Sequence, residues 1–258
     1  GTVYFLHPVM IGSSLTPALR AVTADHVVTT LIPANGSPGI VDGPGETARF
    51  SSPQGVAFGR GMIYEVDWML VRSITPAGVV ARTQLIDATR GVAVDAAGTV
   101  YVTLGCGIQN MTARATLAGS TLSIGPGACA AADGTGTAAR FDRPSGIVVN
   151  ASGTVYVADT GNSTIRAITP GGVVTTLAGL AGTTGSTNGV GSAARFNAPA
   201  GLAVDSSGLL YVADTDNHRI QNFTASGTFL ANWGSQGSGD GQFWSPIGIA
   251  VDSSGNVY

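Results

Sequence analysis

The chain has 258 residues, of which 44% are hydrophobic and 10% are charged, and its formal net charge is −3. All basic residues are arginines, and they are outnumbered by the acidic ones, which argues against a protein that follows a nucleic-acid backbone. No apolar run is long enough to span a membrane as a helix.

The first predicted element, residues 1–31, holds three apolar runs that return later in the chain. Its tyrosine, Tyr4, is one of six, and all six occupy the same place in a repeated phrase, mostly Gly-x-Val/Leu-Tyr: Tyr4, Tyr64, Tyr101, Tyr156, Tyr211 and Tyr258. A glycine also opens the preceding apolar run in five of these units: Gly55, Gly91, Gly146, Gly201 and Gly248. Repeats of roughly this length predict a propeller, a solenoid or an array, because one unit cannot bury its own apolar face.

The pattern inside a unit predicts four antiparallel strands. Runs such as Gly-Val-Ala-Val and Thr-Val-Tyr-Val alternate with a period near two and are rich in β-branched residues. The turn between them, Asp-x-x-Gly at 95–98, 205–208 and 252–255, suits a tight hairpin, because the carboxylate accepts bonds from the next amides and glycine takes a positive φ. Two further strands follow, which favours a propeller blade.

In chain order, one domain over residues 1–258 is predicted, with units at 1–50, 51–87, 88–141, 142–196, 197–243 and 244–258. The first and last units are incomplete in this chain. Phe50, Phe141, Phe196 and Phe243 close the loops between units and are expected to fill the gaps between neighbouring blades.

The phrase Pro-x-Gly-Ile/Leu-Ala-Val-Asp-x-x-Gly-x-Val-Tyr-Val-Ala-Asp-x-x-Asn-x-x-Ile resembles the NHL repeat family of β-propellers, in its bacterial secreted type. Residues 199–220 carry it almost complete, and residues 144–165 carry it with Asn150 in place of the turn aspartate. The resemblance implies an all-β propeller of four-stranded blades, and the six units along the chain predict six of them. It implies little about function, because that family includes enzymes, sensors, RNA binders and adhesive modules.

Three aspartates recur three residues after the tyrosine: Asp67, Asp159 and Asp214. They would either converge on Ca²⁺ or cap their own loops, and their recurrence favours capping. Arg20, Arg72, Arg166 and Arg114 are placed at matching third-strand positions, and Arg49, Arg140 and Arg195 before the repeated phenylalanines. A ring of arginines would recognise an anion, but ties between blades are the favoured interpretation.

The number of histidines distinguishes a binding module from a metal-dependent enzyme. Amidating lyases that the repeat resembles hold a metal with several axial histidines, whereas this chain has only His7, His26 and His218, of which His7 and His218 are expected on one face. We therefore predict no catalytic residue, no metal and no cofactor, with Ca²⁺ as the weak alternative. The other hypothesis is a metal-dependent lyase or lactone-type hydrolase with its site in the axial channel.

The sequence thus predicts a secreted, non-catalytic binding or structural module. Its loop face would contact a protein or polysaccharide through Trp68, Asp216, His218 and Arg195, or its open blade edges would join copies into a homo-oligomer. The low charge and the Ser/Thr/Gly/Ala-rich surface favour an extracellular or cell-surface bacterial protein, or a periplasmic one. Loops on the same face bring Cys106 and Cys129 together, so a disulfide is predicted, with two free cysteines as the alternative.

Overall fold

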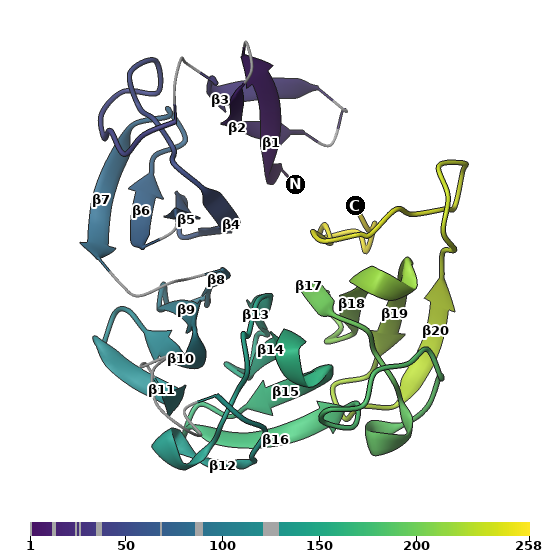
Figure 1. Ribbon diagram of the computed structural model, residues 1–258. Coiled ribbons are helices and arrows are strands. Elements are labelled where there is room, and N and C mark those ends of the chain that lie inside the picture. The colour runs from purple at the N-terminus through teal and green to yellow at the C-terminus, as the bar shows by residue number, and fades with distance from the viewer. Residues whose placement is uncertain are drawn as a thin grey trace.

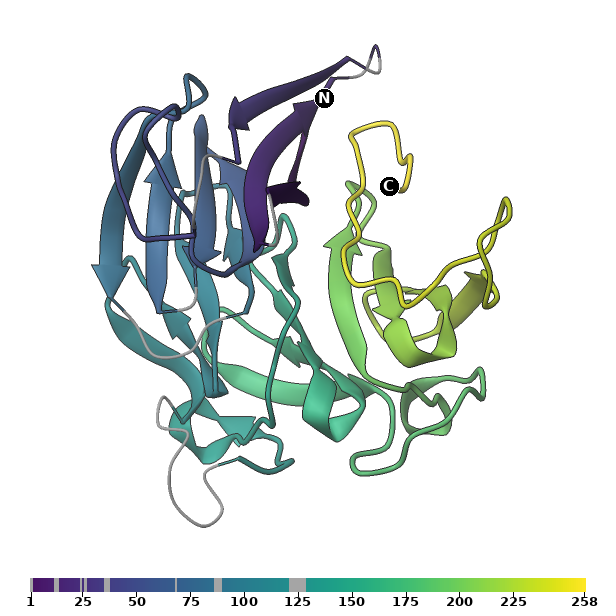
Figure 2. The same cartoon turned by 45° about the horizontal axis from the view of Figure 1, so that its top comes forward.

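The computed structural model describes residues 2–11, 14–23, 25, 27–34, 38–67, 69–85, 90–120 and 129–258. The described residues form five antiparallel sheets arranged as blades around a central axis (Figure 1), and the turned view in Figure 2 shows the blades standing side by side. Within each sheet the strands follow chain order from one edge to the other, except that the short β12 pairs at the outer edge of the fourth sheet. The predicted all-β propeller is therefore confirmed.

The sheets have the following bounds. The first contains β1 (Val3–Ile11), β2 (Ser14–Val22) and β3 (Val28–Ile32). The second contains β4 (Pro53–Gly59), β5 (Met62–Asp67), β6 (Leu70–Ile74) and β7 (Val80–Leu85). The third contains β8 (Val92–Val94), β9 (Val100–Leu104), β10 (Cys106–Asn110) and β11 (Ala115–Ser120).

The fourth sheet contains β13 (Ile147–Val149), β14 (Val155–Asp159), β15 (Thr164–Ile168) and β16 (Val173–Ala178), and the short β12 (Gly134–Thr135) pairs with β16 at its edge. The fifth contains β17 (Pro199–Val204), β18 (Leu210–Asp214), β19 (Arg219–Phe223) and β20 (Phe229–Trp233). The short 3₁₀ helices are η1 (Gly136–Ala138), η2 (Thr160–Asn162), η3 (Gly191–Ala193) and η4 (Thr215–Asn217).

The number of blades is the point on which structure and expectation differ. The structure shows five sheets, and residues 244–258 add a hairpin joined by an isolated bridge between Val251 and Val257. A sixth four-stranded sheet is not shown by the described residues, so a six-bladed ring stays a prediction.

Apolar side chains from the two faces of each blade fill the space between neighbouring sheets. Phe141 is fully buried and belongs to a cluster that combines residues of the third sheet, such as Tyr101, with residues of the fourth, such as Val155. Phe196 occupies the same place between the fourth and fifth sheets. The expectation that these phenylalanines fill the gaps between blades is confirmed.

The turn chemistry also follows the sequence. The Asp205 carboxylate accepts bonds from the amides of Ser207 and Leu209 and from the hydroxyl of Tyr211, and Gly208 has φ +88°. The repeated tyrosine thus bonds to the turn aspartate of its own blade, which the sequence pattern did not reveal. Burial alone would raise the pKa of Asp205, but these donors together lower it.

Close contact between blades near the axis depends on the repeated glycines. A Cβ atom at Gly91 would collide with the carbonyl oxygen of Ser145, and one at Gly146 would collide with that of Ala200. The Gly146 amide donates to the Ala200 carbonyl over 2.9 Å, so the approach is part of a hydrogen bond between blades. A side chain at these positions would force neighbouring blades apart.

Candidate binding site

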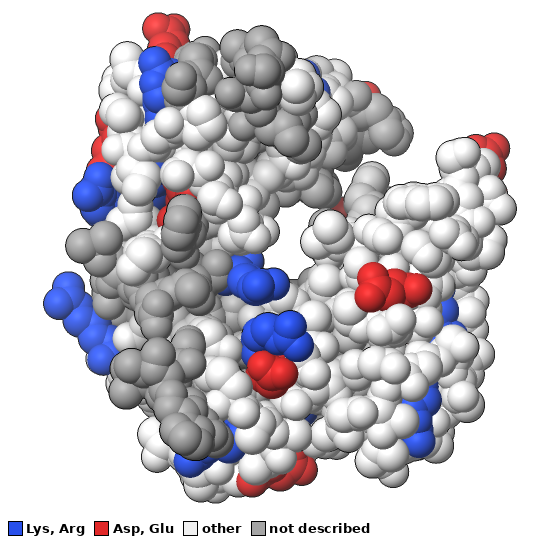
Figure 3. Space-filling model, in the orientation of Figure 1, with Lys and Arg blue, Asp and Glu red and all other residues white. Residues whose placement is uncertain are grey.

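A cavity of about 970 Å³ lies at the axis of the ring, and its opening is visible at the centre of Figure 3. A cavity of this size matches the range of small-molecule sites in proteins. Its lining comes from all five sheets and from the hairpin at 247–250, so its shape depends on how the blades are spaced.

The lining is arranged in tiers because equivalent positions of successive repeats follow one another around the axis. The first tier precedes the repeated glycines, and we call it the rim: Gln54, Arg90, Ser145, Ala200 and Ile247. The glycines form the second tier: Gly55, Gly91, Gly146, Gly201 and Gly248. Aliphatic residues form the third tier: Val56, Val92, Ile147, Leu202 and Ile249. The strand β1 adds Val3, Phe5 and Leu6, so the cavity wall is largely apolar.

The end of the ring that carries the rim also carries η2 and η4, and we call it the rim face. Thr160 of η2 and Thr215 of η4 line the cavity beside the rim. Their hydroxyls bond to the backbone of the next blade, Thr160 to the Pro199 carbonyl over 2.7 Å and Thr215 to the Pro246 carbonyl over 2.8 Å. These polar side chains therefore hold the blades together.

Two residues of the rim itself, Ser145 and Gln54, also form hydrogen bonds within the protein. The hydroxyl of Ser145 contacts that of Thr160 at 2.5 Å and the Ala200 carbonyl at 3.3 Å. The amide of Gln54 donates to the carbonyl and the hydroxyl of Ser52. Arg90 differs, because its exposed guanidinium has no hydrogen bond or ion pair to any described residue.

Basic side chains gather beside the central opening on the face shown in Figure 3. Arg143 belongs to this face, since it follows Asp142, which bonds through its carbonyl to the amide of Gly161 in η2. Its Nε lies 3.4 Å from the Asp142 carboxylate, and its side chain is 66% exposed. The charge of Arg143 is thus partly balanced, while that of Arg90 is balanced by no residue that the structure describes.

The predicted binding residues have different surroundings. Asp216 is exposed in η4, and His218 ends that helix with φ 54°. The Nδ1 atom of His218 accepts a bond from the Ser245 amide at 3.0 Å, and its ring lies 5.9 Å from that of Trp244, which is 73% exposed. Arg195 donates to the carbonyls of Ser192 and Ala194, so it supports its own loop. Trp68 lies outside the described residues.

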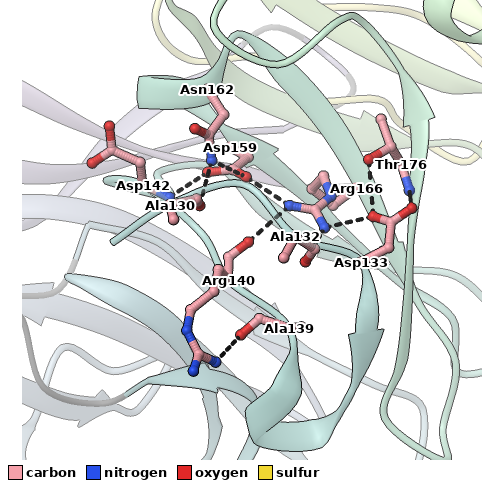
Figure 4. A network of polar contacts seen from close by, with 10 residues as sticks. All are labelled: Ala130, Ala132, Asp133, Ala139, Arg140, Asp142, Asp159, Asn162, Arg166 and Thr176. Atoms are coloured by element: carbon pink, nitrogen blue, oxygen red, sulfur yellow. Dashed lines mark hydrogen bonds and ion pairs between the residues drawn. The ribbon is translucent and has the colours of Figure 1, made fainter. Parts of the chain in front are cut away.

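The repeated aspartates do not cap their own loops, because neither Asp159 nor Asp214 bonds to a backbone amide of the 3₁₀ helix that follows it. They accept backbone bonds from the loop that leads into their own blade instead. In the fourth sheet, Asp159 is fully buried and accepts bonds from the Asp142 amide, the Asn162 side chain and Arg166, whose Nη1 is 2.9 Å away (Figure 4). Arg166 also reaches the carbonyls of Arg140 and Ala132 and the carboxylate of Asp133. We call this arrangement the aspartate–arginine network.

The same network recurs in two other blades. Arg72 bonds to Asp67 at 3.0 Å and to the Arg49 carbonyl at 2.7 Å. Arg219 bonds to Asp214 at 2.8 Å and to the Arg195 carbonyl at 3.1 Å. The predicted bonds to carbonyls and aspartates are present for Arg72 and Arg166. They join the third strand to the aspartate of its own blade and to the loop that leads into that blade, so the predicted tie from one blade to the next is not among them.

Burial raises the pKa of Asp159 to about 6, although Asn162, the Asp142 amide and Arg166 all oppose the shift. Asp159 is therefore ionised and paired at neutral pH.

In the fifth sheet, Arg219 makes the bond to the aspartate, and it stands at a different strand position from the predicted arginines. The assignment of Arg114 to a third strand is wrong, since it lies in the turn between β10 and β11 with φ 53°.

Glu65 is the buried carboxyl that the sequence analysis overlooked. Its side chain is fully buried on β5, and neither carboxylate oxygen has a hydrogen-bond partner among the described residues. Burial and the nearby Asp67 raise its pKa well above the usual value, and Arg72 only partly offsets them. The equivalent residues of the next three blades, Val102, Val157 and Val212, are apolar, so a comparison of the repeats would have singled it out.

The two cysteines form a disulfide, Cys106–Cys129, with 4.9 Å between their Cα atoms. Cys106 begins β10, and Cys129 lies in the segment that enters the fourth sheet. The predicted pairing is confirmed, although Cys106 lies at the start of a strand and not in a loop, because a tight turn joins β9 to β10.

The two described histidines, His7 and His218, lie on different elements of the fold. His7 is exposed within β1, His218 is engaged as described above, and His26 lies outside the described residues. Within the described ranges, no group of three or more His, Cys, Asp or Glu side chains is arranged to hold a metal ion. No helix in the described part of the chain has the length and apolar character needed to cross a bilayer.

Two of the repeats match a known sequence family. Residues 141–168 and 196–223 match the sequence model of the family described as NHL repeat. NHL repeat-containing protein 2 of Bos taurus is 40% identical over 94 residues, a match that covers 34% of this chain and 13% of that protein. The chain therefore corresponds to a small part of that relative.

Solved structures share the fold at low sequence identity. A protein of unknown function from Bacteroides thetaiotaomicron superposes with a TM-score of 0.64 at 18% identity, over 94% of this chain and 61% of that one. An auxiliary nutrient binding protein from the same species gives 0.56 at 19% identity, over 77% and 54%. Virginiamycin B lyase from Staphylococcus aureus gives 0.52 at 12% identity, over 91% and 67%. At such identities the likeness concerns the fold alone.

Proposed function

We propose that this chain, a β-propeller with NHL repeats, is a non-catalytic binding module that receives its ligand through the rim face into the axial cavity. The cavity itself carries the proposal, because its size and its apolar tiers are those of a ligand site. Among its described lining residues the titratable side chains are Arg90, Tyr4 and Tyr258, and none is a carboxylate or an imidazole. Such a lining favours binding over acid–base catalysis.

The rim face would also meet the partner that presents the bound group, a protein or a polysaccharide. Trp244 is strongly exposed beside His218, and Asp216 is exposed in the neighbouring η4. An exposed aromatic ring next to polar side chains is suited to contact with either partner. Self-assembly through blade edges stays a prediction.

The alternative function is a metal-dependent lyase or lactone-type hydrolase. Its support is that virginiamycin B lyase shares the fold. Such an enzyme needs several converging ligands, whereas His218 is bonded to Ser245 and His7 lies within β1. Zinc analysis of protein purified without chelators tests this alternative. We expect no stoichiometric zinc, and one zinc per chain would favour the enzyme.

We further propose an extracellular, cell-surface or periplasmic location. The support is the Cys106–Cys129 disulfide, since such bonds persist in oxidising compartments.

Binding of the neutral fluorophore N-phenyl-1-naphthylamine tests the proposed site. We expect saturable binding of one molecule per chain, and its loss in Ala200→Trp, which places a large ring at the rim. The matched control is Ala151→Trp, in an exposed hairpin turn that does not line the cavity. Equal binding by both variants would contradict the proposal.

A further inference from the structure

We infer that the axial cavity takes a small amphipathic anion, with an apolar body inside the ring and a carboxylate, sulfonate or phosphate head on Arg90. This inference rests on the proposed binding function and names the chemical class of its ligand. It follows from the distribution of polar groups over the cavity, taken tier by tier.

The inner part of the cavity offers almost no polar partner for a ligand. The third tier is aliphatic, and β1 contributes Val3, Phe5 and Leu6 from the opposite side. A polar group placed there would lose its water and gain nothing in return, which costs free energy. An apolar body would instead gain by leaving water.

The polar groups near the mouth are mostly engaged already. The hydroxyls of Ser145, Thr160 and Thr215 bond to neighbouring blades, and the Gln54 amide group donates to Ser52. Among the cavity lining, Arg90 is the charged side chain, and it has no partner among the described residues. A ligand entering the cavity therefore meets one strong donor group, and that group is cationic.

The charge around the mouth selects for an anion. Arg143 stands on the same face as a pair with Asp142, so the pair adds little net charge. The guanidinium of Arg90 has no counter-charge among the described residues. A guanidinium binds carboxylate, sulfonate and phosphate oxygens through two parallel donors. Because Arg90 is exposed at the rim, the pair forms without the full desolvation cost of a buried ion pair.

A pair of matched fluorophores tests the inference. The anionic probe is 8-anilinonaphthalene-1-sulfonate, and the neutral one is N-phenyl-1-naphthylamine, which has the same ring system without the sulfonate. In Arg90→Gln we expect the affinity for the anionic probe to fall about tenfold, while the affinity for the neutral probe is unchanged. Arg90→Lys should recover part of the loss, because it restores the charge without the planar fork.

The double variant Arg143→Gln, Asp142→Asn is the control, because it removes a paired cation and anion of the same face and leaves the net charge unchanged. Its affinity for the anionic probe should stay near that of the native chain. Equal losses in Arg90→Gln and in the double variant, or no loss in either, would overturn the inference while neutral-probe binding upholds the binding function. Failure of both probes to bind the native chain would overturn both.

Discussion

At the scale of single residues, position within the repeat decides what a side chain experiences. Asp205 lies in a hairpin turn, where its donors lower its pKa, while Asp159 lies at the buried end of β14, where burial raises its pKa to about 6. Glu65 has the same burial without the donors. It occupies a place where other blades carry valine, so its charge has nothing to stabilise it except Arg72, which Asp67 already engages.

Glu65 makes stability depend on pH in a defined direction. Its folded pKa is raised, so the unfolded chain loses the proton near its usual pKa while the folded chain keeps it, and the free energy of unfolding falls as pH rises above that value. A tenfold difference in proton affinity between the folded and unfolded chain corresponds to about 1.4 kcal/mol. In urea unfolding at pH 5 and pH 8, we expect Glu65→Val to lose less stability between the two values than the native chain.

The exposed Asp240→Asn variant is the control for that comparison, because it removes a carboxyl without changing a buried one. It should retain the pH dependence of the native chain. A pH dependence in Glu65→Val that equals the native one would show that Glu65 is not its source.

At the scale of elements, the strands and turns were accessible from the sequence. Period-two alternation and Asp-x-x-Gly turns located the hairpins because both are local properties of the backbone. The aspartate–arginine network was anticipated only in part, since Arg219 acts from a different position from Arg166. Arg90 could not be predicted as a binding residue from the sequence. It lines a cavity only because the fold brings the residues that precede the five repeated glycines together around one axis.

The glycine tier is the element on which blade spacing depends. In Gly146→Ala the added methyl group would collide with the Ala200 carbonyl, so we expect a loss of about 1–3 kcal/mol in the free energy of unfolding. Urea unfolding measures the loss. Gly171→Ala is the control, since the nearest atom to its Cβ is 3.8 Å away and its φ is not positive. Similar stability of the two variants would refute a spacing role.

At the scale of the whole molecule, the contacts between blades and the disulfide both stabilise the fold. The Cys106–Cys129 bond ties the start of β10 to the segment that enters the fourth sheet, over a sequence separation of 23 residues. Such a link restricts the unfolded chain, and loops of this length correspond to about 3 kcal/mol. The pairing was predictable because loops on one face of a four-stranded blade meet.

Removal of the disulfide should therefore lower the melting temperature. We expect the double variant Cys106→Ser, Cys129→Ser to melt several degrees below the native chain. Treatment with dithiothreitol should bring the native chain to the same value and leave the variant unchanged. An unchanged melting temperature on reduction would mean that the bond does not stabilise the fold.

The two forms of the aspartate–arginine network bear on how repeats diverge. Arg166 lies opposite Val157, whereas Arg219 lies opposite Asp214, two residues earlier in its strand, and Gln221 fills the place that the arginine left. Gln221 donates to the same Asp214 carboxylate, over 3.0 Å. The two blades thus share the contact to the aspartate, although the arginine that makes it stands at different positions of the strand. When the two repeats are aligned, Thr164 of one stands against Arg219 of the other and counts as a mismatch. A search for further repeats of this kind should therefore accept the arginine at the position of Arg166 or at the position of Arg219.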